Sequence, residues 1–242
     1  MDWRFRRSPT PGRALPPRRG PGQSSAAAPA PALAHGMRLI ERKRAMFADE
    51  TAAHAPRERL IRQTVASFRL DGIDLSEPLL TEAFARRVAH PQMRPAQAQR
   101  IRNHVAILHR IELSLAHGQP LKSPSVLGWY TSVGCGLCTT GPDDSALSRL
   151  ELLVRRINSP HMRLDPAVRE MCDLHARMLA DPIFPGFNGI MARLLLRFHL
   201  GRCKLPAILF RADDAAIAPD CNKLLPRMVQ LIDQAYDQRP AL

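Results

Sequence analysis

Hydrophobic residues recur every three or four positions along most of the chain after residue 56, which is the period of an α-helix. The first such segment begins behind Pro56 and places four apolar side chains on one face: Leu60, Ile61, Val65 and Phe68. The same pattern continues to the end of the chain. It predicts helices near residues 56–68, 76–84, 94–117, 124–130, 143–157, 165–180, 189–200 and 228–236.

Residues with known preferences for helix ends bound several of these segments. Gly118 follows the longest one, as expected of a residue that ends a helix in the left-handed conformation. Asp143 or Asp144 is predicted to cap the helix that ends near residue 157, and the pair Asp165-Pro166 is predicted to cap and begin the following helix. No segment shows the alternation of a strand, so the predicted fold class is all-α.

The first 36 residues differ from the rest in composition. They contain seven Pro and six Arg, and too few apolar residues to form a core. Residues 1–36 are therefore predicted to be a disordered basic tail, and residues 37–242 a helical domain. Translation from Met37 or Met46 would remove this tail, and its charge would then indicate nothing about the protein's partners.

The formal net charge of the 242 residues is +13, and it is unevenly distributed. Residues 1–45 hold ten basic residues against two acidic ones. A basic tail can bind a polyanion, so a basic helical nucleic-acid-associated protein is one interpretation, and a solvated tail is the other. Arg86-Arg87 and Arg155-Arg156 are interpreted as solvated faces, because no aromatic stacking pattern accompanies them.

Two further properties concern location. No apolar run reaches the roughly 18 residues of a membrane-spanning helix, so no membrane association is expected. The five Cys are an odd number in a chain of this length, which fits a reducing compartment, and the protein is predicted to be cytoplasmic.

Cys135 and Cys138 form a C-x-x-C pair without a second pair, so no metal site is expected and structural thiols are the favoured interpretation. His104 and His109 are interpreted as core or surface groups.

The most informative stretch runs from Phe184 to Arg193, where two Gly lie in a tight loop before a strongly apolar helix. Loop amides and a helix N-terminus together form an anion cradle, since the unpaired N–H groups and the helix dipole point the same way. Asn188 tolerates the backbone angles of such a loop. Arg193, one turn into the helix, supplies a fork-shaped donor for phosphate oxygens.

This stretch resembles the signature of the Fic/Doc (Fido) family, which reads His-Pro-Phe-x-Asp/Glu-Gly-Asn-Gly-Arg-x-x-Arg. Four positions keep the family's residues: Phe184, Asn188, Gly189 and Arg193. The resemblance implies a nucleotide-binding site, with ATP as the ligand, formed by Gly186, Asn188, Gly189 and Arg193. The family's activity is the transfer of AMP from ATP to a protein hydroxyl.

Two other patches support the resemblance, which covers about residues 57–210. Ser67 to Gly72 is similar to the family's inhibitory-helix motif, with Asp71 in place of Glu, and it implies an inhibitory pair between Asp71 and Arg193. Asn103, followed by Ala106, looks like the Asn-x-x-Ala of an early core helix. The implied fold is a Fic-fold bundle of about seven or eight helices, in which Gly134 to Pro142 forms a loop or short flap.

The departures from the signature concern the chemistry. Pro182 stands at the catalytic His position and cannot accept a proton, so the general base is missing. Gly186 stands at the acidic position that holds Mg²⁺, which puts metal binding in doubt. Phe187 replaces a Gly of the cradle, and Ile190 replaces the first Arg. His175, seven residues before Pro182, is a weak substitute for the base.

The sequence therefore leaves open whether the chain is an enzyme. The favoured hypothesis is a catalytically impaired Fic-like domain that binds a nucleotide or a protein partner. One alternative is an active nucleotidyl or phosphoryl transferase that uses His175, and the other is the basic nucleic-acid-associated protein described above.

Overall fold

The structure is a computed structural model that describes residues 31–47, 57–73, 75, 77–78, 80–81, 95–134, 141–160 and 163–238. The described residues form eight α-helices and one 3-10 helix, and no strand occurs among them. The helices are α1 (Pro31–Met46), α2 (Arg57–Leu70), α4 (Pro95–Ala116), α5 (Ser123–Gly134), α6 (Asp144–Asn158), α7 (Leu164–Ala180), α8 (Asn188–Arg202) and α9 (Cys221–Asp237), with the 3-10 helix η1 at Ala212–Ala216. The all-α prediction is confirmed.

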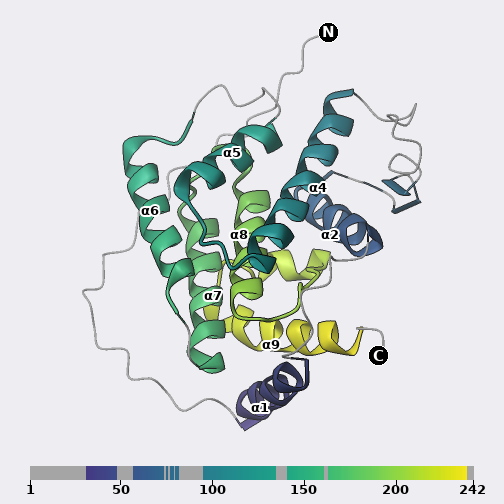
Figure 1. Ribbon diagram of the computed structural model, residues 1–242, viewed down its shortest axis with the longest axis vertical. Coiled ribbons are helices and arrows are strands. Elements are labelled where there is room, and N and C mark those ends of the chain that lie inside the picture. Colours follow the sequence, from purple (N-terminus) through teal and green to yellow (C-terminus); the bar gives the residue numbers. More distant parts are fainter. Residues whose placement is uncertain are drawn as a thin grey trace.

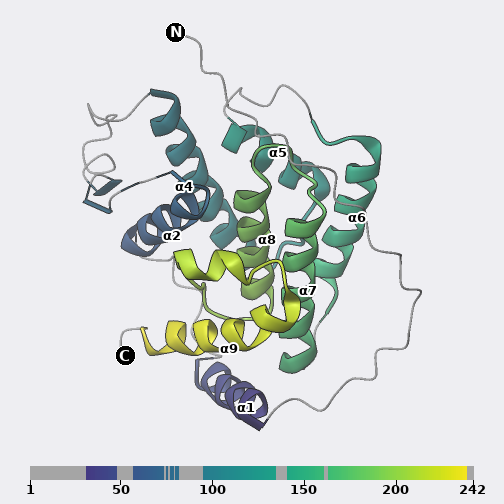
Figure 2. The ribbon, with the colours of Figure 1, turned by 180° about the vertical axis from the view of Figure 1, so that it is seen from behind.

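Helix α8 is the centre of the arrangement. In Figures 1 and 2 it lies between α2 and α4 on one side and α6 and α7 on the other, with α9 and α1 across one end. It contributes buried side chains to two hydrophobic clusters: Leu195 and Phe198 belong to the cluster formed with α2, α4, α5 and α6, while Leu196 and Leu200 belong to the cluster formed with α1, α7 and α9. Its strongly apolar sequence is the consequence of this position, because a helix that is covered on all sides must be apolar on all sides.

Most of the predicted helix ends agree with the structure. Gly118 has a φ of 62° and follows α4, as predicted for a left-handed helix stop. Asp143 caps α6, and its Oδ1 accepts a hydrogen bond from the Ala146 amide at 2.7 Å. The predicted helix near residues 76–84 and the predicted flap at 134–142 lie largely outside the described residues.

Two predicted helix starts were wrong. Helix α7 begins at Leu164, so Asp165 lies in its first turn, where it pairs with Arg169 at 2.9 Å instead of capping the helix. Helix α9 begins at Cys221 behind the Asp220 cap, seven residues before the predicted start at Met228. Helix α7 starts earlier because Leu164 is buried, and α9 starts earlier because Asp220 accepts hydrogen bonds from its first-turn amides. The spacing of apolar residues alone does not indicate these contacts.

Helix α1 begins at Pro31, within the segment that was predicted to be a tail; residues 1–30 lie outside the described residues. Helix α1 packs against α9, where it buries Met37 and Ile40. The contact is close at Gly36, since a Cβ atom there would lie 2.6 Å from Val229 Cγ1. Lys43 adds ion pairs with Asp233 at 2.6 Å and Asp237 at 2.5 Å, so tertiary contacts order this part of the chain.

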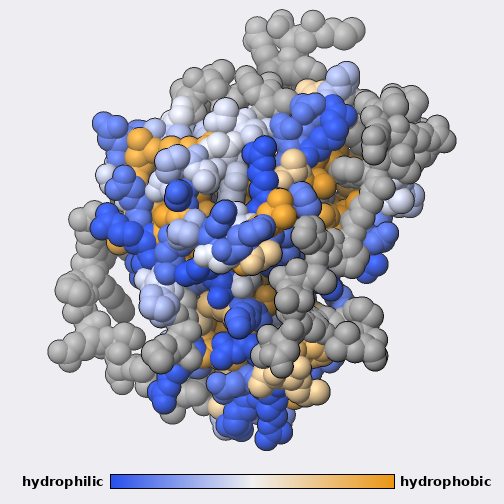
Figure 3. Space-filling model, in the orientation of Figure 1, coloured by the Kyte–Doolittle hydropathy of each residue, from blue (hydrophilic) through white to orange (hydrophobic). Residues whose placement is uncertain are grey.

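The surface is mostly polar. The face in Figure 3 shows hydrophilic side chains with separate hydrophobic areas between them. Met46 and Leu152 are the large hydrophobic residues with high exposure among the described ones, at 78% and 57%. Within the described ranges, no helix is both long enough and apolar enough to cross a bilayer.

The Asp143 cap gives the first testable prediction. Asp143→Ala removes the hydrogen bond to the Ala146 amide and should lower the free energy of unfolding by about 1 kcal/mol. Urea denaturation measures this change. The matched control is Asp144→Ala, which removes the neighbouring, exposed carboxylate and should change stability by less than about 0.5 kcal/mol. Equal stability of the two variants would contradict the capping role.

Candidate functional site

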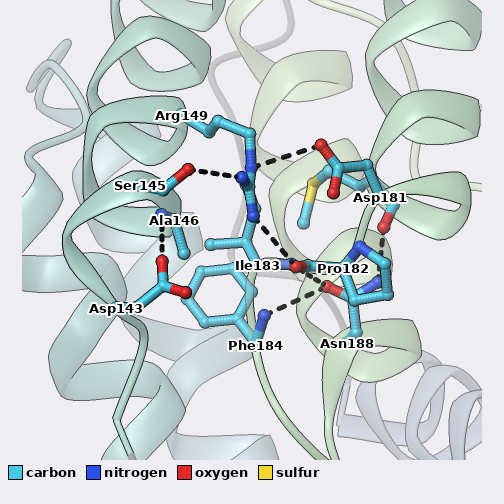
Figure 4. Close-up of polar contacts among 10 residues, drawn as sticks. Asp143, Ser145, Ala146, Arg149, Asp181, Pro182, Ile183, Phe184 and Asn188 are labelled. Atoms are coloured by element: carbon cyan, nitrogen blue, oxygen red, sulfur yellow. Dashed lines mark hydrogen bonds and ion pairs between the residues drawn. The ribbon is translucent and has the colours of Figure 1, made fainter.

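The loop between α7 and α8 is shaped by the side chain of Asn188. Its Oδ1 accepts hydrogen bonds from the backbone amides of Ile183 at 3.0 Å and Phe184 at 3.3 Å (Figure 4). Its Nδ2 donates to the Met178 carbonyl oxygen at 2.5 Å. Gly186, at the tip of the loop, has a φ of 76°, a conformation that favours Gly. The Asn188 side chain is therefore occupied inside the protein and acts on the loop backbone.

The N-terminus of α8 is open at its first turn. The residue before the helix is Phe187, which makes no side-chain cap, and the first turn has no acidic residue. The first amides of a helix have no carbonyl partner within the helix, and the helix dipole adds a partial positive charge there. Asn188 and Gly189 occupy this turn, so their backbone amides fit an anion.

Arg193 lies one turn further along α8 and contacts α2. Its Nη2 forms an ion pair with Asp71 Oδ1 at 2.7 Å and donates to the Ser67 carbonyl oxygen at 2.8 Å, while its Nε donates to Ser67 Oγ at 2.9 Å. Burial lowers the pKa of the Arg193 guanidinium, and the Asp71 carboxylate acts in the opposite direction. The structure brings together the two residues that the resemblance pairs, although their inhibitory role stays a prediction.

Gly189 is the residue of the α8 first turn that lies against this ion pair. A Cβ atom at Gly189 would lie 2.8 Å from Asp71 Oδ1 and 3.1 Å from Arg193 Nη1. The first distance is closer than two such atoms can approach, so the ion pair and the backbone of the α8 first turn are in direct contact. An anion on the amides of this turn would therefore lie next to the Asp71 carboxylate.

Arg149 of α6 contacts the backbone at Pro182, the residue that the sequence resemblance aligns with the catalytic His of the Fic signature. Its Nη2 donates to the Pro182 carbonyl oxygen at 3.3 Å, its Nε pairs with Asp181 Oδ2 at 3.3 Å, and its Nη1 donates to Ser145 Oγ at 2.9 Å (Figure 4). A guanidinium stays protonated near neutral pH and cannot serve as a base. The contact joins segments 33 positions apart, and no local signal in the sequence indicates it.

Phe187 contacts the side chains of Arg100 and Tyr130, neither of which was predicted from the sequence to lie at this site. The guanidinium carbon of Arg100 lies 5.0 Å from the centre of the Phe187 ring, and the Tyr130 ring centre lies 6.3 Å from it. Tyr130 also donates from its hydroxyl to the Pro185 carbonyl oxygen at 3.1 Å. Phe187 is thus part of the packing beside the cradle, and Arg100 brings a second cation to this side of the loop.

His175 is buried in α7, with 4% of its surface exposed. Its ring stacks on Phe210 with 5.4 Å between ring centres, and its Nδ1 has no hydrogen-bond partner among the described residues. Burial, and secondarily the charge of Arg193, lowers the pKa of His175 to about 4, while a hydrogen bond to the Ala192 backbone acts the other way. The ring is neutral near pH 7, but solvent and a substrate hydroxyl have little access to it.

The residues at this site do not fit Mg²⁺. Gly186 offers no side chain at the acidic position, and no group of three His, Cys, Asp or Glu residues in the described part of the chain is arranged to hold a metal. Magnesium prefers carboxylate and phosphate oxygens. Any Mg²⁺ here would have to arrive with the phosphates of a ligand, so no step of the chemistry is assigned to it.

The remaining candidates have structural surroundings. His104 is buried beside Thr64, and burial and the charge of Arg193 lower its pKa to about 3; His109 is exposed. Arg156 pairs with Glu170 at 2.8 Å. Asn103 donates to the Ser132 carbonyl oxygen at 2.6 Å, and Arg155 lies 3.8 Å from Glu151. Cys135, Cys138, Arg86 and Arg87 lie outside the described residues.

Comparison with known proteins identifies the fold. No protein-family model matches the sequence, and no curated protein matches it. Solved structures do match: Fic-1 from C. elegans (TM-score 0.71, 15% identity, 85% of this chain and 71% of that chain), a Fic family protein from Desulfovibrio desulfuricans (0.64, 14%, 88% and 75%) and a Fic domain containing signaling protein from Bacteroides thetaiotaomicron (0.66, 15%, 84% and 94%). The chain therefore has the Fic fold, with the open N-terminus of α8 at the place where the sequence resembles the Fic signature.

Proposed function

We propose that this Fic-fold protein binds the phosphate groups of a nucleotide such as ATP at the N-terminus of α8, and that it does so without transferring AMP. The observation that carries the proposal is the ion pair between Arg193 and Asp71 at 2.7 Å, in contact with the first turn of α8 at Gly189. An Arg beside uncapped helix amides is a recurrent way to bind phosphate.

The pair also sets the affinity for the nucleotide. In the conformation described, Asp71 occupies the Arg193 guanidinium and places a negative charge beside the open amides. A phosphate must displace that carboxylate or bind against its repulsion. Removal of Asp71 should therefore strengthen binding, and removal of Arg193 should weaken it.

Two features support binding without chemistry. Pro182 cannot accept a proton, and the group that contacts its carbonyl is the guanidinium of Arg149. A base typically contributes about 10²- to 10⁴-fold to the rate of such a transfer. His175 stands behind the loop with 4% exposure, so nothing in its surroundings favours it as a replacement.

The test is isothermal titration calorimetry with ATP, with and without Mg²⁺. Asp71→Ala is expected to bind ATP about tenfold more tightly than the unchanged protein, and Arg193→Ala about tenfold more weakly, since a charge-assisted hydrogen bond is worth about 1.5 kcal/mol or more. Asp165→Ala is the matched control, because it removes a carboxylate from an Arg pair remote from the loop. ATP affinity that is the same in all variants would overturn the cradle.

The same samples test the chemistry. Incubated with labelled ATP, Mg²⁺ and cell lysate, the protein should transfer no label above background in a single turnover. Label transfer above background, in the unchanged protein or in the Asp71→Ala variant, would overturn the non-catalytic part of the proposal and leave the binding part intact.

A further inference from the structure

The half-buried side chain of Arg100, on α4, lies beside the loop that leads into α8. Its guanidinium carbon lies 5.0 Å from the centre of the Phe187 ring, and Phe187 is the residue directly before α8. Because a Phe ring centre lies roughly 4 Å from its own Cα, the guanidinium carbon lies within roughly 9 Å of the backbone that begins the helix. Two hydrogen bonds of about 3 Å with one phosphate group between them span such a distance.

The positive charge of Arg100 has no acidic partner among the described residues, whereas Arg193 is bound to Asp71. The Nε of Arg100 is buried without a hydrogen-bond partner, and its two Nη nitrogens are neither buried nor hydrogen-bonded within the described ranges. A guanidinium over an aromatic ring is stabilised by the ring and keeps the N–H groups at its edge. Arg100 therefore presents a charge and unused Nη donors to a ligand at the loop.

The first turn of α8 lacks a charged side chain of its own. It has no acidic residue and no side-chain cap, so its amides are open to an anion. Ile190, which the sequence resemblance aligns with the first Arg of the signature, is apolar and 1% exposed. A cation beside these amides must come from elsewhere in the fold, and α4, which packs against α8, brings Arg100 to the loop.

We propose that Arg100 is a phosphate-binding residue of the nucleotide site and takes the place of the Arg that is absent at residue 190. The inference rests on the proposed function, because it concerns the same ligand. One phosphate group would accept hydrogen bonds from the open amides of α8 and from an Nη of Arg100, while the guanidinium stays over the Phe187 ring. Since Arg100 is not paired with Asp71, this contact forms without opening the Asp71–Arg193 pair.

The test is isothermal titration calorimetry with two probes, ATP and inorganic triphosphate. Arg100→Met keeps the apolar length of the side chain against Phe187 and removes the charge and the donors. It should weaken the binding of both probes about tenfold, as expected for the loss of a charge-assisted hydrogen bond. The matched control is Arg110→Met, which removes an exposed Arg about 15 Å further along α4 and should change neither affinity.

A second variant keeps the test decisive if Arg100→Met does not fold, which thermal denaturation reveals. Arg100→Gln removes the charge and leaves polar atoms at this partly exposed position, so it should fold and show a similar loss for both probes. Either variant, folded and with the affinity of the unchanged protein for both probes, would overturn the role of Arg100. If Arg193→Ala still weakens ATP binding in that case, the proposed function stands without this residue.

The two probes separate a phosphate contact from a contact with the base. Weaker binding of ATP but not of triphosphate in the Arg100 variants would assign Arg100 to the base and overturn the proposal. An equal loss in the Arg110→Met control would show that net charge alone is responsible, and would overturn it as well. Absence of ATP binding in the unchanged protein would overturn both this inference and the proposed function.

Discussion

Acidification from pH 7 to pH 5 is expected to lower the free energy of unfolding of this protein by about 4 kcal/mol, because two buried imidazoles resist protonation. Burial, with the charge of Arg193 as the second cause, lowers the pKa of His104 to about 3 and that of His175 to about 4. In the unfolded chain both return to a pKa of about 6.5. The unfolded state therefore binds more protons throughout this pH window.

The sign follows from that difference. Stability from each neutral imidazole is complete above pH 6.5 and is lost as the pH falls toward the folded-state pKa values of about 4 and about 3. At pH 5 each unfolded imidazole is mostly protonated and each folded one is not, so each contributes about 2 kcal/mol of destabilisation.

Urea denaturation at half-unit steps between pH 5 and pH 7 measures the effect. His175→Phe keeps a ring stacked on Phe210, removes the unpaired Nδ1, and should remove about half of the pH dependence. His109→Phe is the matched control, because the His109 side chain is exposed and hydrated in both states. A His175→Phe variant with the same slope of stability against pH as the unchanged protein would refute the assignment to this imidazole.

The helices could be predicted because the residues that each helix buries are spaced at the helical period along the sequence. Helix α2 buries Leu60, Ile61, Val65 and Phe68, the four residues that the period placed on one face. Helix α4 follows the same rule, and its end at Gly118 is set by a single residue type. These signals lie within one turn of the element that they determine, so a sequence suffices to find them.

The site could be predicted only in part, because half of it consists of contacts between remote segments. The cradle loop has a local pattern of Gly, Asn and an apolar helix. The placement of Arg149 at Pro182 and of Arg100 on Phe187 depends on how α6 and α4 pack around that loop, and neither Arg has a distinctive neighbourhood in the sequence. The order in α1 was missed for the same reason, since its contacts are with α9 at the far end of the chain.

Asn188 is expected to be the most sensitive position of the loop. In Asn188→Ala the amides of Ile183 and Phe184 and the carbonyl of Met178 all lose their partner. Ile183, Phe184 and Met178 are buried, so water cannot replace the side chain without local opening. At about 1 kcal/mol for each hydrogen bond, the free energy of unfolding should fall by about 3 kcal/mol.

The matched control is Asn222→Ala, the same substitution in the first turn of α9, where the Asn side chain is exposed and stability should change by less than about 0.5 kcal/mol. Urea denaturation compares the two variants, and calorimetry with ATP then separates folding from binding. Because the Asn188 side chain is engaged inside the loop, any loss of ATP affinity in Asn188→Ala must come through the loop backbone and should accompany the loss of stability. An Asn188→Ala variant that is as stable as the Asn222→Ala control and yet binds ATP more weakly would instead mean that the amide side chain leaves the loop to contact the phosphate.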